Sequence, residues 1–186
     1  MKRADIAFIA DIRPKRMDLL KERGQLPFDM PDGGKFTPDH AFRLRLMLDL
    51  IGGEDDGLGG LPPSAAAPLV AEALRRCPVH PLRQFTPSDW FAGVAVLERR
   101  FVNADGKEES QRWAVTYSGE LEQLAEWLEQ ERKFEAPGTL PGRTVTGRYK
   151  VVRVFLANMS RAASIVHRRA KEIGFDTFEN KPEASK

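Results

Sequence analysis

Residues 90–102 read WFAGVAVLERRFV and are rich in β-branched and aromatic residues, which favour strands. The next five residues, NADGK, have the composition of a hairpin turn. Residues 111–117, QRWAVTY, then place Trp113, Val115 and Tyr117 at alternate positions, as on one face of a strand. This stretch predicts an antiparallel β-hairpin. We take the hairpin as the start of the C-terminal half and assign the elements that follow relative to it.

Three further elements are expected after the hairpin. The first is a helix capped by Ser118, with a core stripe of Leu121, Leu124, Ala125 and Leu128. Residues 149–156 predict a third strand, and Ser160 is expected to cap a last helix with a basic exposed face made of Arg161, Arg168, Arg169 and Lys171. The order β-β-α-β-α predicts a small antiparallel sheet with covering helices.

The N-terminal half begins with short helical segments. Residues 4–10 fit either a helix or a short strand. Pro14 suits the first turn of a second helix, which we expect to end at Gly24. The Asp32-Gly33 pair is a hairpin signal and predicts a small β-wing over residues 26–36.

Two longer helices are expected after the wing. Thr37 followed by Pro38 predicts a helix start, and that helix runs to about Ile51. Ser64 is expected to cap a second one that reaches Arg76. The whole chain is therefore predicted to be α+β, with a mostly helical winged helix-turn-helix followed by the sheet.

Glycine and proline divide the chain. Residues 52–63 contain five glycines and two prolines, and residues 77–81 contain two prolines. We expect a winged-helix domain at 1–76, a linker at 77–87, a dimerisation or sensing domain at 88–176 and a disordered tail at 177–186. Residues 136–147, with three glycines and two prolines, predict a long loop.

Composition places the chain among ordinary globular proteins. It has 186 residues, of which 41% are hydrophobic and 30% charged. The longest apolar runs are about five residues, too short to span a bilayer, and we expect no membrane partner and no secretory signal. Cys77 is the single cysteine, so we expect a reducing cytoplasm.

The sequence gives no support for an enzyme. Its three histidines and one cysteine lack the spacing of metal ligands, and neither a Walker-type glycine loop nor a Gly-x-Ser-x-Gly elbow is present. We expect no catalytic residues, no metal and no cofactor.

Positive charge is concentrated in two regions. The segment 13–45 contains eight basic and five acidic residues, and the segment 136–186 contains ten basic and four acidic residues. In a helix-turn-helix the second helix enters the major groove, where cations meet phosphates and base edges. The candidate DNA-binding residues are Arg13, Lys15, Arg16, Lys21, Arg23, Lys35, Arg43 and Arg45.

A resemblance to a known family supports this interpretation. Residues 16–26, RMDLLKERGQL, and 34–46, GKFTPDHAFRLRL, resemble the recognition helix, the wing and the following helix of the mercury-resistance-type (MerR) regulators. The resemblance covers residues 4–51. It implies that the second helix reads the major groove while the wing grips the DNA backbone.

The leading hypothesis is a transcriptional regulator that binds double-stranded DNA as a homodimer, paired through an open sheet edge at residues 90–102. No effector ligand is identified. The alternative is an adaptor protein that uses a degenerate helix-turn-helix for protein contacts. Asp18 in the second helix, and the equal numbers of basic and acidic residues in 1–76, favour that alternative.

Overall fold

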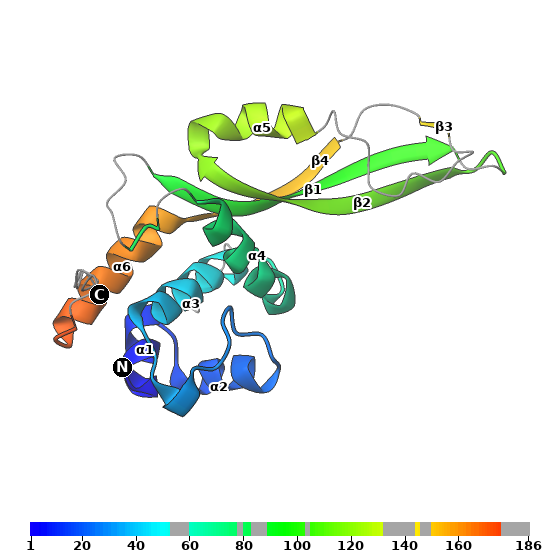
Figure 1. Ribbon diagram of the computed structural model, residues 1–186. Coiled ribbons are helices and arrows are strands. Elements are labelled where there is room, and N and C mark those ends of the chain that lie inside the picture. Colours follow the sequence, from blue (N-terminus) through cyan, green and yellow to red (C-terminus); the bar gives the residue numbers. More distant parts are fainter. Residues whose placement is uncertain are drawn as a thin grey trace, which may run out of the picture.

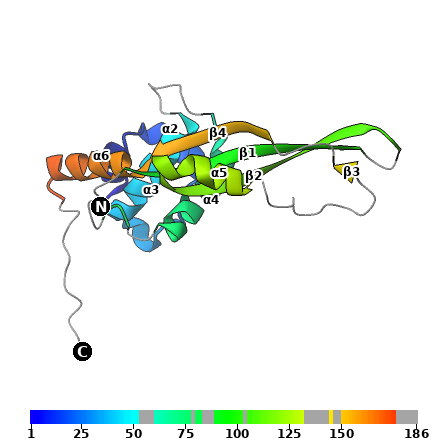
Figure 2. The same ribbon diagram turned by 90° about the horizontal axis from the view of Figure 1, so that it is seen from above.

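The computed structural model describes residues 1–52, 60–77, 80–82, 89–102, 105–131, 144–145 and 150–175. The protein is α+β, as predicted. A helical body lies against one face of an antiparallel sheet, and one helix lies on the opposite face (Figures 1 and 2). The predicted tail at 177–186 lies outside the described residues. Of the predicted loop at 136–147 only residues 144–145 are described, and they form a short strand.

Four strands form the sheet: β1 (Trp90–Val102), β2 (Glu108–Glu120), β3 (Thr144–Val145) and β4 (Lys150–Asn158). β1 is the central strand, with β2 on one side and β3 and β4 on the other. The prediction that residues 90–102 form an open edge is therefore wrong. β4 pairs with β1 from 48 residues further along the chain, and local patterning does not reveal such a long-range partner.

The N-terminal helices are α1 (Arg3–Ala10), α2 (Pro14–Glu22), α3 (Pro38–Ile51) and α4 (Pro63–Arg76). Residues 4–10, whose sequence fits either a helix or a strand, are helical. Proline occupies the first turn of α2, α3 and α4, where a missing N–H costs nothing. Thr37 caps α3 as predicted, because its hydroxyl accepts a hydrogen bond from the His40 N–H.

The predicted β-wing at residues 26–36 is absent. Residues Asp32–Gly34 form a 3-10 turn instead, with positive φ at Gly33 and Gly34. Pro27 and Pro31 flank the turn, and prolines lack the N–H that a strand ladder needs. After the turn, the Phe36 N–H donates to the Met1 carbonyl at 3.1 Å, so this loop is held against the start of α1.

Three serines predicted as helix caps have other roles. Ser118 lies within β2, Ser64 lies inside α4, and Asn158 caps the last helix, α6 (Met159–Glu172), in place of Ser160. Tertiary partners engage two of these hydroxyls. Ser118 accepts from Trp90 Nε1 at 3.0 Å, and Ser160 accepts from the Trp90 N–H at 3.1 Å.

The helix after β2 begins later than predicted. A 3-10 turn at Leu121–Gln123 precedes α5 (Leu124–Glu131). None of its predicted stripe is fully buried, and Leu121 is 48% exposed. α5 instead covers the far face of the sheet with Trp127, whose ring lies 4.9 Å from that of Tyr117.

One hydrophobic core joins the two halves of the chain. It contains buried residues of α1, α3, α4 and α6 together with Ala92 and Val94 of β1. α6 lies along α1 and α3 (Figure 1) and buries Met159, Ala162, Ala163, Val166 and Ala170. The division at 77–87 stays a prediction, but the C-terminal helix completes the core of the N-terminal ones.

The sheet extends well beyond the helical body as a long arm (Figures 1 and 2). We define the arm as residues 96–102 of β1, 108–114 of β2 and 150–153 of β4. A register shift lies between Val96 and Leu97, where β4 carries one extra residue, Val152. Such a bulge increases the local twist of the strand pair.

The shared core can be tested with the tryptophans, because all three lie in the sheet half, at 90, 113 and 127. Met47 of α3 is fully buried, so Met47→Ala should lower the free energy of unfolding by about 2–5 kcal/mol. Tryptophan fluorescence in a urea titration should report that loss. Met30→Ala removes a side chain that is 41% exposed and is the control. An unchanged tryptophan transition for Met47→Ala would contradict a shared core.

Candidate nucleic-acid interface

The start of α2 presents two exposed cations. Arg13 is the N-cap and has extended backbone without a side-chain cap, and Pro14 begins the helix. Arg13 and Lys15 are both exposed. A helix N-terminus carries partial positive charge from its unpaired N–H groups, so this end of α2 favours a nearby anion.

Arg16, predicted beside them, is partly buried. Its guanidinium donates to the Gly52 carbonyl at 3.3 Å and so links α2 to the end of α3. This side chain therefore holds two helices together at the position where we expected a DNA contact.

Asp18, the acid that weakened the DNA-binding interpretation, has a partner within the protein. It forms an ion pair with Arg3 of α1, and the same guanidinium lies 3.4 Å from the Pro14 carbonyl. The pair joins α1 to α2 and neutralises the acid. Sequence reasoning missed Arg3 as a neighbour of α2 because the contact depends on how the two helices cross.

The outward face of α2 is mixed. Met17 and Leu20 are buried, so helical periodicity turns Lys15, Leu19 and Glu22 towards solvent. Lys21 and Arg23 are exposed on the flanks, and Lys35 is exposed in the loop before α3. The basic character of this surface thus comes from the two ends of α2 and from the loop.

Arg43 and Arg45 do not project as predicted. Arg45 is only 7% exposed and forms ion pairs with Asp49 and, at 3.4 Å, with Asp11. Arg43 is partly exposed and lies 2.6 Å from Asp39 on its own helix. Arg45 in particular is placed to stabilise the core side of α3, because its charge is turned away from solvent.

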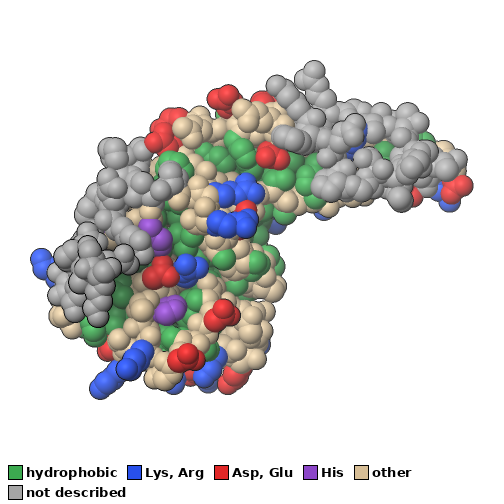
Figure 3. Space-filling view, viewed as in Figure 1, with side chains coloured by type: hydrophobic (Ala, Val, Ile, Leu, Met, Phe, Trp, Pro, Cys, Tyr) green, Lys and Arg blue, Asp and Glu red, His purple; other side chains and the backbone are tan. Residues whose placement is uncertain are grey.

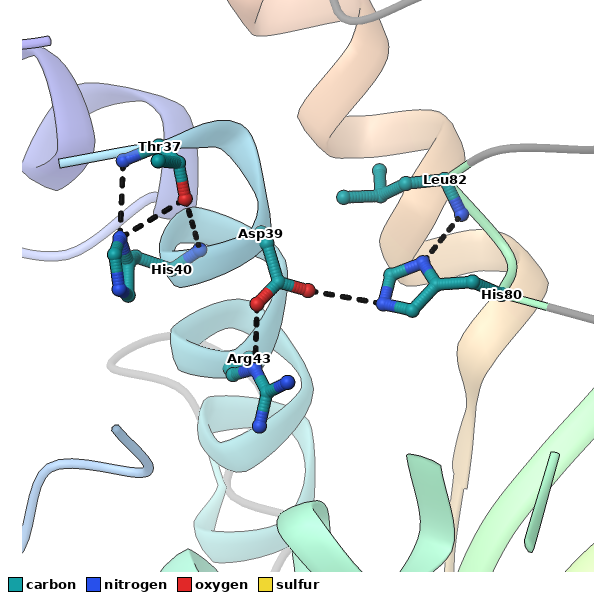
Figure 4. Close-up of polar contacts among 6 residues, drawn as sticks. All are labelled: Thr37, Asp39, His40, Arg43, His80 and Leu82. Atoms are coloured by element: carbon teal, nitrogen blue, oxygen red, sulfur yellow. Dashed lines mark hydrogen bonds and ion pairs between the residues drawn. The ribbon is translucent and has the colours of Figure 1, made fainter. Parts of the chain in front are cut away.

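A polar cluster that the sequence did not reveal lies beside Arg43 (Figure 4). Asp39 Oδ1 lies 2.9 Å from His80 Nε2, while the Leu82 N–H donates to His80 Nδ1 at 3.3 Å. The His80 ring also packs edge-on against Phe42, 5.4 Å between ring centres. Both ring nitrogens are engaged, so the cluster fastens residues 80–82 onto α3.

The charges around Asp39 determine the pKa of its carboxyl group. Burial raises the pKa of this carboxyl, but hydrogen bonds and charge from His80 and Arg43 outweigh burial and lower the pKa from 3.8 to about 2. The ionised form is therefore the one that the fold stabilises.

The described residues hold no group of three His, Cys, Asp or Glu side chains that could bind a metal ion. Within the same ranges, no helix combines the length and apolarity needed to cross a membrane. Comparison with known proteins identifies no relative: no family model, curated protein or solved structure matches the chain. The resemblance to MerR-type regulators therefore stays a prediction.

Arg43 and Arg45 provide a matched pair for testing which arginine is structural. Arg45→Ala leaves Asp11 and Asp49 without this buried partner and should lower the free energy of unfolding by about 3 kcal/mol. Arg43→Ala breaks a partly exposed pair on one helix and should cost about 0.5 kcal/mol. Chemical denaturation measures both, and equal losses would contradict the assignment.

The Asp39 cluster predicts a specific pH dependence. A lowered folded-state pKa stabilises the fold above pH 3.8, and this contribution is lost as pH falls through about 2. Asp39→Asn should therefore be less stable than the native protein at pH 7, with the difference shrinking between pH 3.8 and about 2. Urea titrations across this range measure it, with Asp29→Asn at an exposed acid as control. A constant difference would show that the charge of Asp39 is not what stabilises the cluster.

Proposed function

We propose that the protein is a DNA-binding transcriptional regulator that contacts double-stranded DNA with the start of α2 and the residues around it. The observation that carries this proposal is the pair of exposed cations, Arg13 and Lys15, at a helix N-terminus without a side-chain cap. Cationic side chains and free backbone N–H groups are what DNA phosphates bind.

The surrounding charges support the same surface. Asp18 of α2 is paired with Arg3, so it does not oppose a phosphate as an unpaired carboxylate would. Lys21, Arg23 and Lys35 add exposed positive charge on the flanks. α1 and α2 are consecutive helices joined by a short turn, which is compatible with a helix-turn-helix.

The homodimer and the cytoplasmic location belong to the proposal. Two-fold DNA sites are bound by two-fold proteins. Since β1 is central, a dimer formed by strand pairing would use the outer edge of β2 or of β4, each of which pairs only with β1 among the described residues.

An adaptor function is the alternative, and one observation favours it. Leu19 is 42% exposed in the middle of the outward face of α2, and Glu22 lies beside it. An exposed leucine next to an acid suits a protein surface better than a phosphate. On this reading the protein has no salt-dependent affinity for duplex DNA.

Binding to a labelled duplex tests the proposal directly. Arg13→Ala/Lys15→Ala should weaken binding at least about tenfold. It should also reduce the slope of log K against the logarithm of the salt concentration by about two. Glu22→Gln should strengthen binding, because it removes a negative charge from the outward face of α2. Arg161→Ala/Lys171→Ala on α6 is the charge-matched control. Unchanged affinity in a folded Arg13→Ala/Lys15→Ala variant would refute the role of α2.

A further inference from the structure

The arm of the sheet has one face that continues the surface packed against the helices. Ala92 and Val94 point into the helical core, and alternate residues of a strand share a face. Val96, Glu98 and Arg100 therefore lie on this same side, further out along β1. We call it the helix-side face of the arm.

Strand pairing brings further side chains to this face. Arg112 of β2 and Lys150 of β4 are both register partners of Glu98, one on each side, and Arg153 is the partner of Val96. Directly paired residues project from the same face of a sheet. Four cations from three strands, Arg100, Arg112, Lys150 and Arg153, thus surround Glu98. The other acid of this face, Glu108, is the register partner of Val102 at the outer end of the arm.

The carboxylate of Glu98 is mostly covered, whereas the cations around it are exposed to solvent. The Glu98 side chain is 11% exposed, whereas Arg100 and Arg112 are 58% and 64% exposed. Arg112 Nε lies 2.6 Å from Glu98 Oε2. The hydrogen bond from Arg112 lowers the pKa of Glu98, and the positive charges of Arg112, Arg100 and Lys150 lower it further. Glu98 therefore anchors the guanidinium groups while leaving their outer sides to solvent.

The end of α4 extends this positive surface towards the helical body. Arg76 donates to the Thr116 carbonyl of β2 at 3.2 Å, and Arg75 beside it is 76% exposed. Glu72 pairs with both. Together with the arm these residues give six cations and three acids, Glu72, Glu98 and Glu108. Figure 3 shows Lys and Arg side chains gathered where the arm leaves the body.

We propose that the helix-side face of the arm, together with Arg75 and Arg76, is a second surface that binds the phosphate backbone of double-stranded DNA without reading its sequence. Neighbouring strands lie about 4.8 Å apart, so Arg112 and Lys150 span roughly 10 Å across β1, wide enough to meet more than one phosphate. The surface needs no contact by α2 and therefore goes beyond the proposed function.

The aromatic residues favour duplex over single-stranded DNA. Proteins that bind single strands stack bases on exposed aromatic rings. No aromatic residue lies on this face among the described residues of the arm. Phe155, just inside the arm on β4, is partly buried, and its ring centre lies 5.7 Å from the Arg153 guanidinium. Trp113 is the partner of Leu97 and lies on the opposite face. Phosphates are thus the groups that this face is equipped to contact.

A charge-removal experiment on the full-length protein tests the proposal. The probe is a labelled mixed-sequence duplex of about three helical turns, titrated between about 50 and 200 mM salt. Arg100→Gln/Lys150→Gln/Arg153→Gln should weaken binding at least about tenfold and shallow the salt slope by two to three. Arg161→Gln/Arg168→Gln/Lys171→Gln on α6 makes the same charge change elsewhere and should have a much smaller effect. Equal losses in the two variants, or none in the first, would overturn the proposal.

A gain of binding separates electrostatics from folding defects. Glu98→Gln keeps an oxygen acceptor for Arg112 and removes the negative charge at the centre of the four cations, so binding should tighten about two- to fivefold. Unchanged or weaker binding by a folded Glu98→Gln variant would overturn the proposal. Tighter binding to a single strand of the same sequence would overturn the assignment to duplex DNA.

The same titration distinguishes this surface from α2. Loss of binding in the arm variant with none in Arg13→Ala/Lys15→Ala supports the arm surface and refutes the role of α2. The reverse result supports α2 and refutes the arm. Losses in both variants support two separate surfaces.

Discussion

Three helices of the body meet at Asp11, the residue that ends α1. Its backbone is left-handed, with φ of 61°, and its carboxylate forms ion pairs with Arg45 of α3 at 3.4 Å and with Arg169 of α6 at 2.7 Å. Arg169 also donates to the Phe8 carbonyl at 2.9 Å and lies over the Phe8 ring. One side chain thus links α1, α3 and α6 at the point where α1 ends, and the buried core beneath it holds the same three helices together.

A second junction fastens the sheet to the helices. The Ser118 hydroxyl accepts from the Trp90 indole and donates to the Ala73 carbonyl of α4 at 3.1 Å, so two strands and one helix share one oxygen. Gly93, on the opposite face of β1, is required for the close approach of β4, because a Cβ there would lie 2.3 Å from the Phe155 carbonyl. Together these contacts set the direction in which the arm leaves the body.

Local chemistry predicted the elements well, and long-range contacts account for the errors. Proline positions and β-branched residues located α2, α3 and β1, since those signals act within a few residues. The hairpin signal at Asp32-Gly33 failed because the flanking prolines cannot join a ladder. Ser118 was assigned as a cap because its true partner, Trp90, lies 28 residues away. The cations of the arm were missed for the same reason, since only the register of three strands brings them together.

The place of α6 in the core has a consequence for how the chain folds during synthesis. α1 and α3 cannot bury the part of their apolar surface that contacts α6 until the residues around Val166 and Ala170 have been made. At about 5–20 residues per second, the roughly 120 residues between the end of α3 and Ala170 take some 6–24 s to add. Throughout that interval the nascent helices expose the surface that α6 later covers. With this topology, the nascent chain therefore has to be kept from aggregating on the ribosome until α6 has been made.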